Sequence, residues 1–246
     1  MLAVYERHRA VHPYGIFDVA NLWDRSRWWL RDGAVVGLLA LPGSAVPVVY
    51  AVSADADAQT LDLLDDLAPD LPPRIVITGP EGLTARLSDA YRPLWSAPHV
   101  KMALARRDRL PPPDPDVRVL SSADLSRLER LFAADPHTGT YFHVSLLDSG
   151  HYVGIGDDGE LVAAGGVHLI DRDHGVTALG NVFTHPQHRR LGLGRRVTAT
   201  LCHRLIAEVD VIGLNVRRDN AGARALYEHL GFVPVVRYEE AELTRR

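Results

Sequence analysis

The chain has 246 residues, of which 46% are hydrophobic and 24% are charged, and its formal net charge at pH 7 is −4. This length accommodates one large domain or two small ones, and the composition is ordinary for a protein with a packed core. A negative net charge argues against a nucleic-acid-binding protein, which needs basic residues spread over one face. The single cysteine, Cys202, excludes an internal disulfide and a zinc site built from several cysteines, so a cytoplasmic protein is expected.

The N-terminal region predicts neither a signal peptide nor a membrane span. Charged residues interrupt the first segment, MLAVYERHRAV, too early for the apolar core of a signal peptide. Residues 34–54 form a long uncharged run, but Pro42, Gly43 and Pro47 divide it into two valine-rich pieces. Such pieces, preceded by the Asp32-Gly33 turn, are typical of consecutive antiparallel strands. No membrane association is therefore expected.

A proline-rich segment at 111–116, PPPDPD, divides the chain near its middle. Four prolines in six residues disfavour both a helix and a central strand and favour a stiff connector. The expected organisation is a first domain at 1–110, a linker at 111–116 and a second domain at 117–246. In the first domain the patterns predict strands at 27–31, 34–41, 46–52, 74–78 and 100–105, with helices through residues 61–67 and 81–91.

The second domain is expected to repeat the element order of the first. It begins with a strand at 117–120 and a helix at 123–133. Three strands, a helix, a strand, a helix and a strand then follow in both halves, which suggests an internal duplication. The strands of this second series are expected at 152–155, 162–170, 177–184, 212–217 and from 233 onward, and its helices after residue 192 and at 221–230.

The segment at 188–196, HRRLGLGRR, places four arginines around two glycines. Leu193, Val197, Leu201 and Leu205 recur at helical spacing behind it, so the glycines open a helix. Unpaired N–H groups at a helix start bind anions, and glycines let an anion approach the backbone. A phosphate group is the expected ligand. The corresponding segment of the first half, SADADAQT at 53–60, has aspartates instead, so only the second half is expected to bind it.

Two other glycine-loop motifs do not fit this segment. The dinucleotide fingerprint requires a glycine or alanine three residues after its second glycine, and a buried strand before the loop. This chain has Val197 at that position, and the polar segment QHRRL precedes the first glycine. A nucleoside-triphosphate loop requires a lysine followed by serine or threonine, where this chain has Arg195-Arg196.

The second half resembles the GNAT superfamily of acyl-CoA-dependent N-acyltransferases. Residues 189–194, RRLGLG, match the family's Gln/Arg-x-x-Gly-x-Gly/Ala loop, and the preceding VFTHP resembles the end of its fourth strand. Residues 214–232, LNVRRDNAGARALYEHLGF, resemble its fifth strand, loop asparagine, tyrosine-bearing helix and closing Gly-Phe. The implied fold is an α/β, GNAT-like mixed sheet flanked by helices, with two tandem GNAT-like halves similar to the glycine N-acyltransferase-like branch.

The resemblance implies an acetyl-CoA or other acyl-CoA co-substrate and a set of residues that bind it. The pyrophosphate is expected on the loop and the pantetheine along the edge of the strand at 182–184. Tyr227 is expected to be the general acid, because a phenol of pKa about 10 can protonate a departing thiolate of pKa about 8.5. The expected cofactor-binding residues are Val182, Phe183, Thr184, Arg189, Arg190, Gly192, Leu193, Gly194, Arg195 and Asn220.

The general base stays open at the level of sequence. Many relatives use a carboxylate on the fourth strand, but residues 176–185 contain no Asp or Glu. His168, His185, Glu160 and a water chain are the alternatives, and a histidine suits the task by its reference pKa of about 6.5. His185 and His188 have a ligand-like spacing, but the neighbouring arginines disfavour a cation, so no metal is expected.

The predicted function is transfer of a short acyl group, most simply acetyl, from acyl-CoA to a primary amine by direct attack in a ternary complex. A small molecule or an amino acid is the expected acceptor, and a homodimer is compatible with the sequence. The alternative is a CoA-binding sensor or scaffold without catalysis, which would not need Tyr227.

Overall fold

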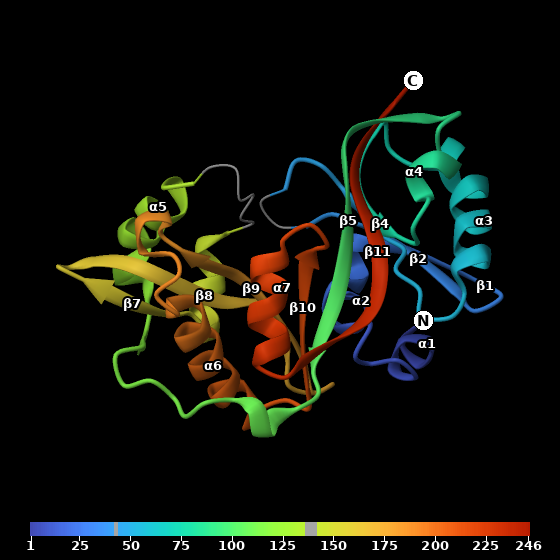
Figure 1. Ribbon diagram of the computed structural model, residues 1–246. Helices are drawn as coiled ribbons and strands as arrows, with labels where there is room; N and C mark the ends of the chain where they lie inside the picture. Colours follow the sequence, from blue (N-terminus) through green and yellow to red (C-terminus); the bar gives the residue numbers. More distant parts are fainter. Residues whose placement is uncertain (42–43, 136–141) are drawn as a thin grey trace. The chain divides into compact units, whose positions relative to one another are not determined.

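The computed structural model describes residues 1–41, 44–135 and 142–246, which form two compact units (Figure 1). Unit 1 comprises Met1–Met102, Asn215–Ala221 and Pro234–Arg246, and unit 2 comprises Ala103–Leu214 and Gly222–Val233. This division differs from the expected boundary at 111–116. The C-terminal strand belongs mostly to unit 1, and the proline segment lies inside unit 2.

Unit 1 is a mixed sheet with helices on both of its faces. Strands β1 (Ser26–Arg31), β2 (Ala34–Leu39), β3 (Val48–Tyr50), β4 (Arg74–Gly79), β11 (Phe232–Arg245) and β5 (Tyr91–Leu104) neighbour one another in that order. β3 and β4 are parallel, whereas β1–β2, β2–β3 and β4–β11 are antiparallel. Asp32 and Gly33, with φ of 50° and 85°, form the predicted turn between β1 and β2.

The helices of unit 1 differ from the expectation in two ways. α3 (Asp57–Leu67) is present, but the expected helix at 81–91 shrinks to α4 (Leu83–Arg86), and β5 already begins at Tyr91. α1 (Leu2–Glu6) and α2 (Pro13–Asn21) were not expected. α2 starts with a proline at its first position, where the missing N–H costs nothing.

The two faces of the unit 1 sheet have different linings. Val36, Val49 and Ile77 pack with Leu64 of α3 in an apolar core. Tyr50, which follows Val49 and so points to the opposite face, packs against the ring of Tyr5 from α1 with ring centroids 5.9 Å apart. α3 and α1 therefore cover opposite faces.

Unit 2 is a five-stranded sheet in the order β6 (Arg118–Val119), β7 (Val153–Asp157), β8 (Glu160–Asp171), β9 (Val176–Thr184) and β10 (Val211–Arg217). All neighbouring pairs are antiparallel except β9 and β10, which are parallel. Its helices are α5 (Leu125–Ala133), α6 (Leu193–Ile206) and α7 (Ala221–His229), close to the predicted ranges. Chain order and strand order together confirm the predicted α/β class with a mixed sheet flanked by helices.

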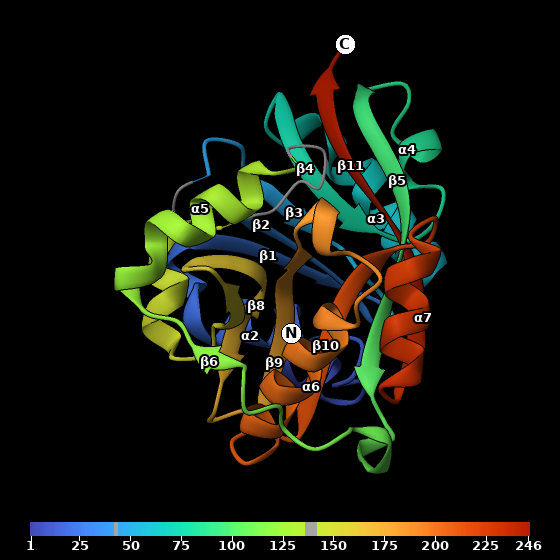
Figure 2. The same cartoon turned by 60° about the vertical axis from the view of Figure 1, so that its left-hand side comes forward.

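α5 and α6 cover opposite faces of this sheet (Figure 2). A Cβ atom at Gly165 of β8 would lie 3.0 Å from Val197 of α6. At the next residue, Gly166, it would meet the ring of Tyr152, which packs in one apolar cluster with Leu128 of α5. Consecutive strand residues point to opposite faces of a sheet, so these contacts place α6 on one face and α5 on the other. We call them the α6 face and the α5 face.

The proline segment is fixed to unit 2 along α6. Arg196 contacts Asp114 at 2.5 and 2.9 Å and Asp116 at 2.6 Å. The Thr200 hydroxyl accepts a hydrogen bond from the Asp114 N–H at 2.9 Å, and the His203 ring contacts the Pro111 carbonyl. These contacts make 111–116 an ordered part of unit 2, whereas a stiff linker between two domains was expected.

The start of the second half is stabilised by an ionised Asp124. This carboxylate completes a capping box with Ser121 and accepts hydrogen bonds of 2.6 and 3.0 Å from Arg118. The Arg118 guanidinium is the main reason that the pKa of Asp124 is lowered to about 2. Because the folded protein favours the charged form, this stabilisation is complete above pH about 4, the unfolded pKa, and is lost as the pH falls toward 2.

We expect Asp124→Asn to lower the free energy of unfolding at pH 7 by about 1–2 kcal/mol, since it removes a cap and charge-assisted hydrogen bonds. Urea unfolding at pH 7 and at pH 2.5 measures this effect, which should shrink at the lower pH. Asp116→Asn is the control, because this exposed carboxylate forms a single surface ion pair and should change stability by less than about 0.5 kcal/mol. An equal loss at both pH values would contradict the role of the ionised carboxylate.

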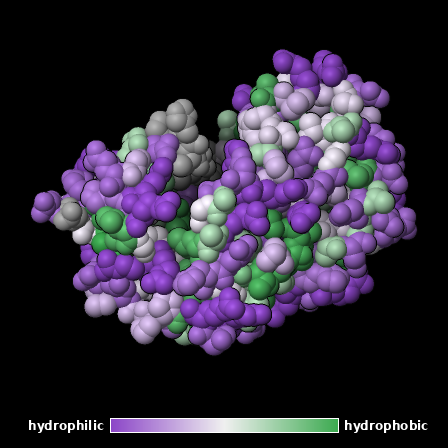
Figure 3. Space-filling view, in the orientation of Figure 1, coloured by the Kyte–Doolittle hydropathy of each residue, from purple (hydrophilic) through white to green (hydrophobic). Residues whose placement is uncertain are grey.

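Hydrophilic residues predominate on the face shown in Figure 3, with smaller hydrophobic areas between them. Among the described residues, no helix combines the length and the apolar character needed to cross a bilayer.

Candidate functional site

The glycine-rich loop between β9 and α6 has a backbone that only small or strained residues adopt. Arg190 and Gly192 have positive φ values of 68° and 77°, and α6 begins at Leu193 directly after them. A Cβ atom at Gly192 would have no atom of the described chain within 4 Å, so the space beside its backbone is open. The loop therefore presents bare backbone at the start of a helix, as predicted from the two glycines.

The first turn of α6 offers N–H groups to a ligand. The N–H groups of Arg195 and Arg196 bond to the Gly192 carbonyl at 3.0 and 3.1 Å. Within the described ranges, no backbone acceptor is recorded for the N–H groups of Leu193 and Gly194, and no side chain caps the helix. Such donors, at the positive end of a 14-residue helix, suit a phosphate or pyrophosphate group.

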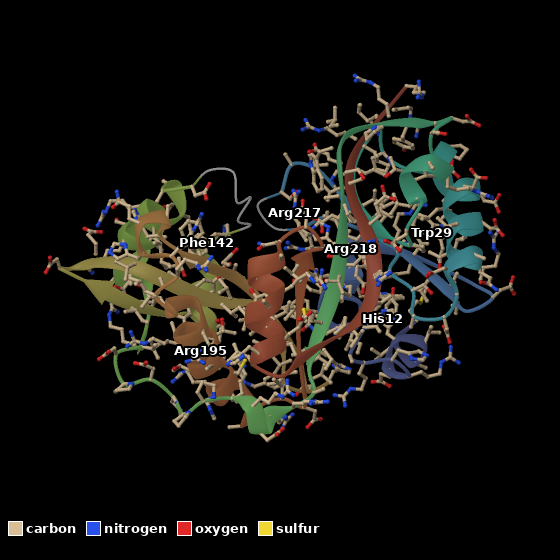
Figure 4. All side chains as sticks on the ribbon, viewed as in Figure 1. His12, Trp29, Phe142, Arg195, Arg217 and Arg218 are labelled. Atoms are coloured by element: carbon tan, nitrogen blue, oxygen red, sulfur yellow. The ribbon has the colours of Figure 1, made fainter. Side chains whose placement is uncertain are left out.

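The arginines around the loop do not all have the same role. Arg196 is engaged by the two aspartates of the proline segment, and Arg189 pairs with Asp135 at 2.7 Å. Arg195, labelled in Figure 4, contacts the His229 Nε2 at 3.3 Å instead of a described carboxylate, so its positive charge is available to an anion. Arg190 is exposed. The concentrated charge predicted from sequence is thus partly compensated, and Arg190 and Arg195 contribute most of what is left.

Gly194, the second glycine, allows close packing of the helix start. A Cβ atom there would lie 3.2 Å from Leu226 of α7 and 3.4 Å from the Thr184 hydroxyl at the end of β9. The glycine thereby brings the first turn of α6, α7 and the end of β9 together in unit 2. The first glycine leaves space for a ligand, whereas the second glycine shapes the wall of the site.

The strand β9 continues beyond Leu179, the last residue at which it pairs with β10, and one edge of its backbone is not paired with β10 from there on. β10 pairs with β9 only from Val211↔Val176 to Leu214↔Leu179. On the other side, β8 continues to pair with β9 as far as Thr184. In the described part of the chain, residues 180–184 of β9 therefore have a strand partner on one side only, which suits an extended ligand with amide groups such as pantetheine.

The predicted residues of this edge have different environments. Phe183 is buried in the apolar cluster of the α5 face, so only its backbone can face a ligand. Val182 and Thr184 point to the α6 face, where Val182 lies against Gly165 and Thr184 against Gly194. The structure thus brings the strand edge and the glycine loop to one end of β9.

Tyr227 lies on α7 and is buried. Its ring packs against Phe232 with centroids 5.8 Å apart. Burial, and secondarily the neighbouring Cys202 thiol, raises the pKa of Tyr227 above its ordinary value. Asn220 immediately precedes α7, as expected for a loop asparagine, and its N–H bonds to the Arg217 carbonyl.

His168, Asn181 and Tyr152 form a polar group on the α5 face of β8 and β9, and only part of this group was expected. The ring of His168 lies against Gly180, where an added Cβ atom would be 2.0 Å from the imidazole. The next residue, Asn181, has a positive φ of 53° and lies at a bulge between β8 and β9. Its amide contacts the His168 Nε2 at 3.4 Å and donates to the Tyr152 hydroxyl at 2.8 Å.

His168 was a candidate base from the sequence, whereas Asn181 and Tyr152 were not expected at the site. The signal was present, since a Gly-Asn pair inside a predicted strand favours a bulge. The two other side chains considered as bases have other partners: Glu160 forms a bidentate pair with Arg130, and the His185 Nδ1 accepts the Gln187 N–H. Among the described residues, no group of three histidine, cysteine or acidic side chains is arranged to hold a metal ion.

Comparison with known proteins shows related sequences for the half of the chain that contains the loop. Residues 120–232 match the acetyltransferase (GNAT) family model. The chain is 32% identical over 126 residues to the N-alpha-acetyltransferase RimI of Mycobacterium tuberculosis, covering 47% of this chain and 77% of that protein. It is 38% identical over 120 residues to a mycothiol acetyltransferase of Beutenbergia cavernae, covering 43% of this chain but only 39% of that protein. The match thus spans well under half the length of the latter relative.

Solved structures extend the likeness of fold to the whole chain. A Drosophila protein from a structural genomics programme superposes with a TM-score of 0.69 at 17% identity, covering 99% of this chain and 94% of that one. A tandem GNAT protein from the clavulanic acid biosynthesis pathway gives a TM-score of 0.52 at 15% identity, covering 88% and 81%. At these identities the likeness establishes the fold, which agrees with the expected GNAT-like architecture. With the glycine loop, the parting of β9 from β10 and the match to RimI, the chain belongs to the acetyltransferase (GNAT) family.

Proposed function

We propose that the protein transfers an acetyl or other short acyl group from acyl-CoA to a primary amine, by direct attack in a ternary complex. The loop at 189–195 carries the proposal, because it combines open backbone at Gly192, N–H donors of the first turn of α6 and the charge of Arg190 and Arg195. The pyrophosphate would bind there, and the pantetheine would bind along β9 from Thr184 toward Gly180. This stretch of strand is about 13 Å long.

The reaction needs a proton donor for sulfur, and Tyr227 is the proposed one. The amine nitrogen attacks the carbonyl carbon, the carbon–sulfur bond breaks and its electron pair stays on sulfur. The hydroxyl of Tyr227 gives that sulfur a proton, so CoA leaves as the thiol. The two related proteins named above, RimI and the mycothiol acetyltransferase, are both acetyltransferases, which favours acetyl over longer acyl groups. An amino acid or another small amine is the proposed acceptor.

The direct test is mass spectrometry of the products after incubation with acetyl-CoA and a panel of amines and amino acids. We expect one class of acceptor to gain an acetyl group with release of one CoA per product. The competing function is a CoA-binding sensor or scaffold. Tight CoA binding together with no acetylated product from any acceptor in the panel would favour that alternative.

Unit 1 is proposed to bind no cofactor at the place that corresponds to the glycine loop. There the segment between β3 and α3 carries Asp55, which pairs with His8 at 3.3 Å. The Ser53 hydroxyl already accepts the Ala56 N–H at 2.7 Å, and α3 opens with Asp57 in its first turn. Carboxylates at the start of this helix repel a phosphate, and the Ala56 N–H, which could bind one, already donates to the Ser53 hydroxyl.

We therefore expect calorimetry with CoA to give one site per chain. Asp55→Asn tests the assignment, because it removes a carboxylate from the unit 1 segment and should leave both the stoichiometry and the affinity unchanged. Two sites per chain, or an affinity that changes with Asp55→Asn, would contradict a cofactor site confined to unit 2.

A further inference from the structure

The position of His168 distinguishes it from the other side chains that could deprotonate the acceptor. Leu179 is the last residue of β9 that pairs with β10, and Gly180, against which the His168 ring lies, is the next. In the proposed binding mode this is where the acyl end of the cofactor arm would arrive. His185 directly follows the end of β9, five residues beyond Gly180 and about 17 Å from it along the chain. Glu160 is eight residues from His168 along β8, about 26 Å away.

The surroundings of His168 select one form of its ring. The Asn181 Nδ2 donates to the Tyr152 hydroxyl, which turns the Asn181 Oδ1 toward the imidazole. That oxygen can only accept a hydrogen bond, so the Nε2 of His168 carries the hydrogen and the lone pair lies on Nδ1. Burial lowers the pKa of His168, while the contact with Asn181 raises it and only partly compensates. The ring is therefore neutral near pH 7 and can accept a proton.

The backbone of β8 and β9 is shaped around this group. Gly180 leaves room for the imidazole, and Gly166, two residues before His168 in β8, leaves room for the Tyr152 ring, which an added Cβ atom would approach to 2.3 Å. Asn181 keeps its amide in place through a left-handed conformation that few residues other than glycine adopt. The backbone thus accommodates a buried group of polar side chains at the point where β9 and β10 separate. This arrangement indicates a chemical role for the group.

We propose that His168 is the general base of the transfer and that Asn181 and Tyr152 are positioning residues that fix its tautomer. This inference rests on the proposed acyl transfer. Nδ1 takes one proton from the acceptor nitrogen as the new carbon–nitrogen bond forms and the carbon–sulfur bond breaks. Tyr227 supplies one proton to sulfur, and the imidazolium proton then returns to the phenolate through solvent. The net change is amine plus acyl-CoA to amide plus CoA thiol.

Four variants test the inference, with kcat/KM measured from pH 5 to 9 on the acceptor found by the product analysis. The wild-type protein should lose activity as the pH falls through the pKa of His168, which lies below 6.5. His168→Gln should lower kcat/KM at pH 7.5 at least tenfold and abolish that acidic limb, with CoA affinity unchanged. His185→Gln is the matched control and should keep both the rate and the limb.

The remaining two variants keep the base and change what holds it. Asn181→Gly retains a residue that tolerates the positive φ but removes the amide, so the acidic limb should move to lower pH, because the contact that raises the pKa of His168 is gone. Gly180→Ala places a Cβ atom 2.0 Å from the ring, so the ring must shift: the thermal midpoint should fall, and in addition kcat/KM should fall and the acidic limb should move. A purely structural role for these residues would change stability without moving the pH profile.

The outcomes separate the two proposals. If the wild-type protein acetylates no amine, the proposed function fails, and the assignment of a base fails with it. If the wild-type protein acetylates an amine and His168→Gln keeps its rate and its acidic limb, the function stands and the inference is overturned. If His185→Gln is the variant that loses the limb, His185 is the base instead.

Discussion

Replacement of Gly192 by valine is expected to weaken CoA binding at least 100-fold, which corresponds to about 2.7 kcal/mol of binding free energy. Two causes act together. Gly192 has a φ of 77°, where a side chain costs about 1–2 kcal/mol, so the loop would tend to leave the conformation that exposes its N–H groups. The valine side chain would also fill the open space through which a pyrophosphate approaches the backbone. Calorimetry with CoA measures the effect.

Gly159→Val is the matched control for backbone strain. Gly159 lies in the turn between β7 and β8 of the same unit, has a φ of 84° and likewise has no described atom within 4 Å of an added Cβ. Both variants should lose a similar amount of stability, about 1–2 kcal/mol, but only Gly192→Val should lose CoA affinity. Equal CoA affinity in the two variants would remove the loop from the cofactor site.

The loop could be predicted from sequence because its physics is local. Two glycines, a run of arginines and the helical spacing that follows fall within about twenty residues, and each has one simple structural meaning. The strands of unit 2, the start of α6 and both ends of α7 were predicted nearly correctly for the same reason. The sequence suggested more uncompensated positive charge on the loop than the structure has. Arg189 pairs with Asp135, 54 residues away, and Arg196 pairs with Asp114, 82 residues away, so no local pattern indicates these partners.

Contacts between distant segments account for what was missed. β11 lies between β4 and β5 of unit 1, although it follows β10 of unit 2 along the chain, and no local pattern indicates such a strand order. The buried Lys101 of β5 is another case, since its ammonium lies over the rings of Tyr14, Tyr50 and Tyr238, at 4.7, 5.4 and 5.3 Å. Burial is the main reason that its pKa is lowered to about 7.

His12 and Trp29, labelled in Figure 4, show the same limit for aromatic residues in unit 1. The His12 ring packs against Tyr5 with centroids 4.5 Å apart, and burial lowers its pKa to about 3. Trp29 packs partly buried against the apolar core beside α3, as expected for an aromatic residue in a strand. No local pattern in the sequence indicates which groups these rings contact.

The role proposed for Tyr227 depends on the protonation state of its hydroxyl. Burial raises the pKa of this phenol, so the neutral form, which can donate a proton, persists to higher pH than in a solvated tyrosine. The sign of the expected pH dependence follows: Tyr227 should not produce a loss of turnover as the pH rises to 10. A departing thiolate, with an ordinary pKa of about 8.5, is a weaker base than a phenolate, so the proposed donation is a hydrogen bond from the neutral hydroxyl that strengthens as negative charge builds on sulfur and completes proton transfer as CoA leaves.

Tyr227→Phe is therefore expected to lower turnover by about 10²- to 10⁴-fold, or roughly 3–5 kcal/mol of barrier, with CoA affinity unchanged. Phenylalanine keeps the ring contact with Phe232 and removes only the hydroxyl. Turnover at saturating substrates and CoA affinity by calorimetry are the two measurements. Tyr91→Phe, which removes a buried hydroxyl of unit 1 bonded to the Pro72 carbonyl, controls for a general loss of stability and should keep normal turnover. Unchanged turnover in Tyr227→Phe would exclude this hydroxyl from the mechanism, and a loss of affinity as large as the loss of turnover would make Tyr227 a binding residue instead.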